Sequence, residues 1–130
     1  MKILTSTIGR ILLSIPFLIS GIMHFLNADK MAGFVPSFLP GGGAFWVYLT
    51  GLVLIAGGIS FIAGKYLRFS GFAIAGLLVV FIATIHIPNL SNPQMQQMAF
   101  SGLMKDLGLA GAALLLAGLE PSKKIVGAFA

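Results

Sequence analysis

The sequence contains no cysteine among its 130 residues. This absence excludes disulfide bonds, thiol catalysis, zinc sites built on cysteine and covalent attachment of a c-type haem. Charged residues are also scarce, at 8% of the chain, and only 3 of them are acidic. A soluble domain of this size carries about a quarter charged residues. The chain therefore has too few polar side chains to cover a water-soluble globule.

Hydrophobic residues make up 58% of the sequence, and the mean hydropathy is +1.02. They gather in four apolar runs, at residues 8–26, 44–63, 69–87 and 103–119. Each run approaches the ~20 residues that a helix needs to cross a bilayer, and a backbone that spans lipid must be helical. The first run is too long for a signal peptide and lacks a cleavage site, so we expect it to be retained. The sequence predicts an all-α integral membrane four-helix bundle, a single domain over residues 1–130.

The formal net charge is +5, and its distribution favours a membrane rather than a nucleic acid as the partner. In a four-span chain, six basic residues fall on one side of the bilayer: Lys2, Arg10, Lys65, Arg68, Lys123 and Lys124. The other side carries Lys30 and, at the membrane edge, Lys105. Cytoplasmic loops are enriched in lysine and arginine. We therefore predict that both termini face the cytoplasm and that the two longer connections, near residues 27–43 and 88–102, face outward.

Two histidines end apolar runs in a similar way. His24 and His86 are each followed three residues later by an asparagine, Asn27 and Asn89. Helical spacing places each histidine on one face with other residues of its run: Arg10, Ser14, Phe17 and Gly21 in the first, and Arg68, Ala75 and Val79 in the third. This parallel suggests a duplicated helical hairpin.

The fourth run begins with Lys105 and Asp106, at the same level of the membrane as both histidines. Ionisable groups inside a membrane are costly and usually face the bundle interior or a cavity. One interpretation is a shared polar cavity near the outer face, lined by His24, His86, Lys105 and Asp106, with structural roles for Arg10, Arg68, Asn27 and Asn89. In the alternative, the lysine snorkels, the aspartate favours the positive end of its helix, and the histidines lie among lipid headgroups.

Such a cavity has several candidate ligands. A quinone head group needs donors such as histidine or lysine at the end of an apolar slot. Two histidines on facing helices can also ligate a b-type haem, and a zinc site would need a third ligand such as Asp106 or Asp29. We favour a quinone-like or other lipophilic ligand, with His24, His86 and Lys105 as polar contacts and Asp106 orienting or neutralising them.

The second hypothesis is a non-enzymatic assembly or scaffolding subunit. Glycine and alanine let helices approach closely in lipid, and such faces could bind a partner protein or a second copy. The small residues predicted to pack are Gly51, Gly57, Gly58, Gly71, Ala75, Gly76, Gly108, Gly111, Ala112 and Gly118. No nucleophile–base pair or phosphate loop is visible, so we expect no independent catalytic activity.

The connection after the first run, residues 31–46, is apolar and aromatic, and its prolines prevent a continuous helix. We expect it to lie on the outer interface, as an anchor or as a cover over the mouth of the bundle. Within the runs, Ser14, Ser20 and Thr84 are predicted to form helix-to-helix hydrogen bonds.

Several motifs follow one another in a recognisable order. They are RILLSIPFLISGIMHF from Arg10, then FVPSFLP, YLTGLVLIAGG, KYLR, HIPN and LMKDLGLAGAALLL. Together they resemble the DoxX family of small four-span membrane proteins, and the similarity covers nearly the whole chain. The resemblance implies a four-helix bundle in a bacterial inner membrane. It places the recurring arginine, histidine and lysine of the family at Arg10, His24, Arg68, His86 and Lys105.

The resemblance implies varied functions. Some members resemble the small subunit of a thiosulfate:quinone oxidoreductase, others are associated with oxidative-stress complexes, and distant eukaryotic relatives assist receptor assembly. Many members carry a glutamate in the second run at the position of Leu54. Chemistry that depends on that glutamate is therefore in doubt for this chain.

Overall fold

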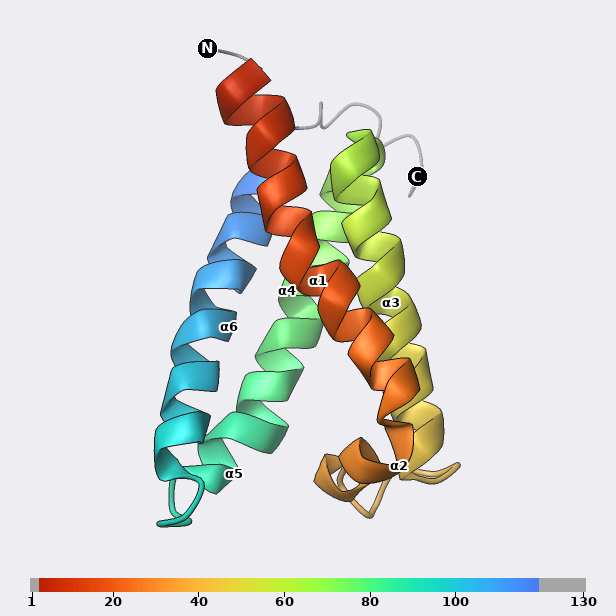
Figure 1. Cartoon of the computed structure of the whole chain (residues 1–130), viewed down its shortest axis with the longest axis vertical. Coiled ribbons are helices and arrows are strands. Elements are labelled where there is room, and N and C mark those ends of the chain that lie inside the picture. Colours follow the sequence, from red (N-terminus) through yellow and green to blue (C-terminus); the bar gives the residue numbers. More distant parts are fainter. Residues whose placement is uncertain (1–2, 120–130) are drawn as a thin grey trace.

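Four long helices run the length of the molecule (Figure 1). The computed structural model describes residues 3–119. Its helical elements are η1 (Ile3–Ile8), α1 (Gly9–Leu26), α2 (Ala28–Met31), η2 (Ala32–Phe34), α3 (Gly43–Ala63), α4 (Leu67–Phe81), η3 (Ile82–His86), α5 (Ile87–Asn89) and α6 (Gln96–Ala117). The stretches long and apolar enough to cross a membrane are Ile3–Leu26, Gly43–Ala63, Leu67–Asn89 and Gln96–Ala117. The predicted all-α membrane bundle is confirmed.

The fourth helix begins earlier than the sequence pattern indicates. The apolar run predicts a start at residue 103, whereas α6 starts at Gln96. Hydropathy marks the part of a helix that lies in hydrocarbon, and a polar first turn extends the helix beyond that part. The connection between α5 and α6 therefore covers only residues 90–95. The predicted longer connection over residues 88–102 is wrong.

The bundle consists of two helical hairpins. α1 packs along α3, α4 packs along α6, and a smaller contact between α3 and α4 joins the two halves. A Cβ added at Gly21 would lie 2.8 Å from the carbonyl oxygen of Gly51, and one added at Gly71 would lie 2.6 Å from that of Ala113. These glycines allow the close backbone approach that helices use in lipid. The packing prediction is wrong for the glycines that face open space, Gly76, Gly108 and Gly111.

The predicted inner face of the first span is confirmed. The residues buried on α1 are Ser14, Phe17, Gly21 and His24. Phe17 packs edge-on against Phe61 of α3, with the ring centroids 5.7 Å apart. Both belong to a core shared by the two hairpins, which also contains Leu54, Ile74, Leu78 and Ala113.

The predicted face of the third span is wrong at Val79, which is 56% exposed. The buried side of α4 instead includes Leu67, Gly71, Ile74 and Leu78. Beyond α4 the backbone widens into the π-helix η3, which ends at His86. Pro88 gives a physical reason, because it has no N–H to donate to the carbonyl of Thr84, four residues earlier. Regular α-helical bonding therefore cannot continue through this turn.

Two of the predicted helix-to-helix hydroxyl bonds are wrong. Ser14 and Thr84 donate to carbonyls four residues earlier in their own helices, at 2.6 and 2.7 Å. Where no water is present, that carbonyl is an acceptor within easy reach of a serine or threonine hydroxyl. A hydroxyl bond between helices does occur from Ser60 to Ser70, at 2.8 Å, and it joins α3 to α4.

Arg10 fastens the start of α1 to the end of α3. Its Nη1 donates to the carbonyls of Phe61 and Ile62, at 2.9 and 3.1 Å. The last carbonyls of a helix have no intrahelical donor, and a cation there complements the helix dipole. α3 ends at Ala63 and is capped by Gly64, where φ is 72° and a side chain would also collide with the Arg10 guanidinium. Arg10 thus has a clear structural contact.

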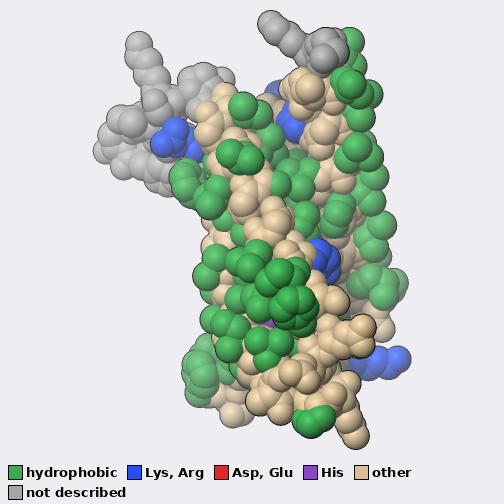
Figure 2. Space-filling model, turned by 90° about the vertical axis from the view of Figure 1, so that its left-hand side faces the viewer, with side chains coloured by type: hydrophobic (Ala, Val, Ile, Leu, Met, Phe, Trp, Pro, Cys, Tyr) green, Lys and Arg blue, Asp and Glu red, His purple; other side chains and the backbone are tan. Residues whose placement is uncertain are grey.

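The end of the bundle that carries α2, α5, His24 and His86 is called the histidine end below. Lys30 and Lys105 belong to this end, and the opposite end carries Arg10, Lys65 and Arg68. Three further basic residues in the charge argument, Lys2, Lys123 and Lys124, lie outside the described residues. Hydrophobic side chains cover much of the face seen in Figure 2, with few lysines or arginines among them. This surface contacts the lipid bilayer.

The direction of the bundle in the membrane can be tested by cysteine labelling. The chain has no native cysteine, so Asn92→Cys and Ser122→Cys each introduce a single thiol; Ser122 lies outside the described residues. If both termini face the cytoplasm, as the charge distribution predicts, an impermeant thiol reagent should label only the Asn92 variant in intact cells. Both variants should react after permeabilisation. Labelling at Ser122 in intact cells would reverse the predicted orientation.

Candidate functional site

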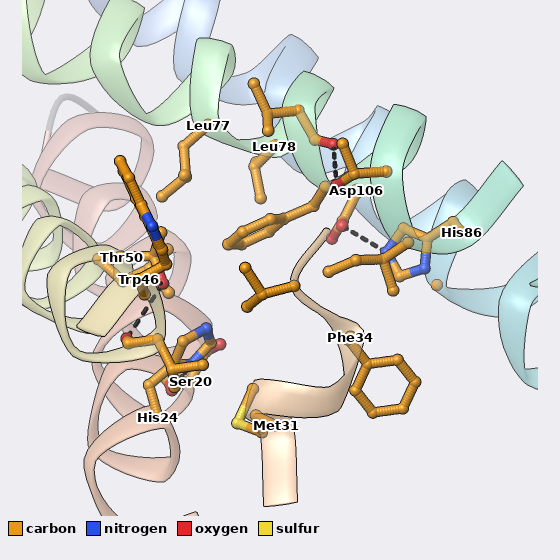
Figure 3. A pocket seen from close by; sticks show the side chains of 18 of the residues that line it. Ser20, His24, Met31, Phe34, Trp46, Thr50, Leu77, Leu78, His86 and Asp106 are labelled. Carbon is orange, nitrogen blue, oxygen red and sulfur yellow. Dashed lines mark hydrogen bonds and ion pairs between the residues drawn. The ribbon is translucent and has the colours of Figure 1, made fainter. Parts of the chain in front are cut away.

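A cavity of about 820 Å³ lies between the two hairpins at the histidine end. Its walls come from α1, α3, α4, η3 and α6, and the connection after α2 closes part of it (Figure 3). Most of its lining side chains are apolar, among them Phe17, Leu54, Leu78 and Phe81. Ligand sites in proteins commonly measure about 300–1,000 Å³ and are largely apolar. The cavity therefore has the size and character of a ligand site.

The four residues predicted as ligand contacts all line this cavity: His24, His86, Lys105 and Asp106. Figure 3 shows His24 on one wall, near the α1 and α3 residues, and the two residues His86 and Asp106 on the opposite wall. Polar groups therefore face one another across an apolar space.

His24 is buried, with 6% of its surface exposed, and it is held in one orientation. Its Nδ1 lies 2.6 Å from the carbonyl oxygen of Ser20. Its ring stacks on Phe81, with the ring centroids 6.1 Å apart. Behind it lies Gly51 of α3, where an added Cβ would come within 2.8 Å of the His24 Cβ. His24 lines the cavity, and the contact of Nδ1 with Ser20 leaves its other nitrogen, Nε2, available to a ligand.

A hydrogen bond between His86 and Asp106 joins η3 to α6. The Nε2 of His86 lies 2.8 Å from the Oδ2 of Asp106, and their side chains are 20% and 7% exposed. The imidazole lies over Gly102, where an added Cβ would be 2.6 Å from the ring. Gly102 precedes Asp106 by one helical turn, so the two lie on the same face of α6. The glycine therefore lets the imidazole approach α6 closely enough to reach the carboxylate.

Asn27 and Asn89 make equivalent contacts beside the two histidines. The side-chain amide of Asn27 donates to the carbonyl of Met23 at 3.1 Å, and that of Asn89 donates to Ile85 at 2.8 Å. In both places the acceptor is the residue immediately before the histidine. This correspondence supports the hypothesis of a duplicated hairpin.

The remaining charged residues that were predicted at the site differ in their position relative to the cavity. Lys105 is exposed although it contributes to the cavity lining. Arg10 and Arg68 lie outside the lining. The guanidinium of Arg68 is 5.9 Å from the ring centroid of Phe72 on the same helix.

The apolar connection between the first two spans covers one side of the cavity. The cavity lining includes three residues of this segment, Met31, Phe34 and Phe38. The indole Nε1 of Trp46 donates to the carbonyl of Pro40 at 2.7 Å, which ties the end of the connection to α3. Phe38 is 83% exposed, so the same segment also presents an aromatic ring outward. The segment thus lies along the cavity, as a cover would, and also exposes a ring that suits an interfacial anchor.

A family model described as DoxX matches residues 5–87, which is more than half of the chain. The chain belongs to the DoxX family. The DoxX match includes both histidine-bearing helices and the cavity cover, and it ends before α6, which supplies Lys105 and Asp106. No curated protein and no solved structure matches the chain.

Sequence reasoning missed several residues of this DoxX cavity. Phe81 and Thr50 look like ordinary span residues, and nothing in their spacing marks them. Gly102 could have been found, because a glycine one turn before a membrane-embedded Asp106 leaves room for a partner side chain. Leu54, at the position where many members carry glutamate, is 1% exposed and lines the cavity. The cavity therefore has an apolar group at that position.

Proposed function

We propose that this DoxX protein binds a quinone-like or other lipophilic ligand in the cavity at the histidine end, as a redox-associated subunit of a bacterial inner membrane. The observation that carries the proposal is an apolar cavity of about 820 Å³ with polar groups on two opposite walls. An apolar ring and tail would be accommodated by the walls. The polar groups of His24 and of the His86–Asp106 pair would fix the head group.

A metal centre fits this geometry less well. Axial ligation of a b-type haem would have to use the Nδ1 of His86, because the Nε2 of His86 is bonded to Asp106. Ligation through Nε2 would separate this pair and leave a largely buried carboxylate without its partner, which is costly. Within residues 3–119, no group of three or more potential ligands could hold a metal ion. The arrangement favours an organic lipophile.

Trp46 provides a direct test, because it is the single tryptophan of the chain and it lines the cavity. Decylubiquinone titrated into the protein in lipid nanodiscs should quench its fluorescence saturably. Ser20→Phe adds a ring to the α1 wall of the cavity and should raise the apparent Kd at least about tenfold, because it occupies the space of the ligand.

Ser101→Phe is the matched control for this measurement. Ser101 is exposed on α6 and does not line the cavity, so this variant should keep the Kd of the original protein. Quenching that rises linearly with quinone concentration, with no difference between the two variants, would show partition into lipid and would contradict the proposal.

A second candidate function is an assembly subunit without a ligand of its own. The supporting observation is that Gly76, Gly108 and Gly111 face open space on the surface of α4 and α6. Small residues on a lipid-facing surface permit close approach of another helix, from a second copy or from a partner protein. A tight partner in a pull-down, together with a cavity that binds no quinone, would favour this function.

A further inference from the structure

The hydrogen bonds already present in the cavity walls determine what the walls can offer to a ligand. Carbonyl and carboxylate oxygens only accept hydrogen bonds. His24 therefore carries a proton on Nδ1, which points to the Ser20 carbonyl, and His86 carries one on Nε2, which points to Asp106. In a neutral imidazole, the second ring nitrogen is then an acceptor. Neither histidine offers its proton to the cavity.

Other polar side chains in the lining follow the same pattern. The hydroxyls of Thr50 and Thr84 donate to the carbonyls of Trp46 and Val80, at 2.8 and 2.7 Å. The indole N–H of Trp46 donates to Pro40. Each donor is thus bonded to a backbone carbonyl. The two hydroxyls keep only acceptor capacity for a ligand.

The acceptors that remain are accessible from the cavity. Among the described residues, no fully buried side-chain nitrogen or oxygen lacks a hydrogen-bond partner. The Nε2 of His24 and the second carboxylate oxygen of Asp106 are therefore not sealed within packed side chains, and both residues line the cavity. The donors left in the lining are the Ser20 hydroxyl, the second amide proton of Asn89 and the exposed Lys105. The walls offer mainly acceptors.

We infer that the cavity prefers a head group that donates hydrogen bonds, namely a hydroxylated ring such as a hydroquinone, over the corresponding dicarbonyl. The inference rests on the proposed function. A hydroquinone carries a hydroxyl on each side of its ring, and these can donate to His24 on one wall and to Asp106 on the other. A quinone carbonyl would face an acceptor at both positions and would leave buried acceptors unpaired. This assignment replaces the expectation that the histidines donate to a quinone.

Three ligands with the same ten-carbon tail test the preference. They are decylubiquinol, decylubiquinone and the dimethyl ether of the quinol, which keeps the ring but has no O–H. Binding is measured by calorimetry in nanodiscs under argon. The quinol should bind about tenfold more tightly than either of the others, because one or two hydrogen bonds to buried acceptors distinguish them.

Two variants test which side chains cause the preference for the quinol. His24→Phe removes the acceptor and keeps a ring against Phe81, and Thr50→Val removes a second acceptor with little change in shape. Both should reduce the quinol selectivity, and Thr50→Val keeps the test available if the first variant does not fold. Met23→Phe, exposed on α1 and outside the lining, should retain the full selectivity.

The outcomes separate the two proposals. Quinone binding as tight as that of quinol, or tighter, would overturn the inference and leave the proposed function standing. Full selectivity in both acceptor variants would also overturn it, because the preference would then arise elsewhere. Binding by none of the three ligands would overturn the proposed function together with the inference.

Discussion

Replacing His86 with leucine is expected to lower the free energy of unfolding by about 3–5 kcal/mol. The substitution removes the partner of Asp106, whose side chain is 7% exposed. A charge that stays buried without a partner is far more costly than the loss of the attraction itself. Steric trapping in bicelles measures the unfolding free energy of the original protein and of the variant.

The double variant His86→Leu with Asp106→Leu is the control for this effect. It removes the carboxylate as well, so most of the lost stability should return. Asp106→Asn should cost much less than His86→Leu, because the amide oxygen can still accept from Nε2. If the double variant loses as much stability as His86→Leu and Asp106→Leu lose together, the two residues are not coupled and the contact between them has no role in stability.

Gly21→Val is expected to destabilise the protein by about 3 kcal/mol. A Cβ at this position would lie 2.5 Å from the Ile55 side chain and 2.8 Å from the carbonyl oxygen of Gly51. One of these neighbours is backbone, so α1 and α3 would have to separate. Because the hairpin packs by close backbone contact, its association should weaken along the whole crossing. The same steric-trapping measurement quantifies the change.

Gly108→Val is the matched control. It adds the same side chain to a membrane-crossing helix at a position where nothing lies within 4 Å. The unfolding free energy should therefore change little. A loss as large as that of Gly21→Val would show that the helix, rather than the α1–α3 contact, responds to the substitution.

The fold could be predicted from the sequence where helical periodicity is uninterrupted. The inner face of α1 follows the regular spacing of Ser14, Phe17, Gly21 and His24, and this face is the buried one. The same reasoning wrongly placed Val79 on the face of His86, because periodicity does not reveal that a π-helix lies between these two residues. Charge and hydropathy determined the level of each residue in the membrane. They could not determine its rotation after an irregular turn.

The depth of the candidate site in the membrane could be predicted from the sequence. The contacts between its residues could not. The positions of Lys105 and Asp106 at the start of a span indicate that they lie at the depth of the histidines, and all four residues line one cavity. The contact between His86 and Asp106 depends on the rotation of η3 and on the space above Gly102. The direction in which each side-chain hydrogen-bond donor of the cavity points depends on the backbone carbonyl that accepts its proton. Neither property is encoded in residue type or spacing alone.

The two glycines behind the histidines set the depth at which the imidazoles stand in the cavity walls. Gly51 lies behind His24 and Gly102 lies behind His86, one in each hairpin. Even a methyl group at either position would displace the imidazole by part of an ångström toward the opposite wall. The gap between the two walls would then narrow without any change in the groups that line it. Residues with no side-chain chemistry of their own thus determine how large a ring the cavity can accept.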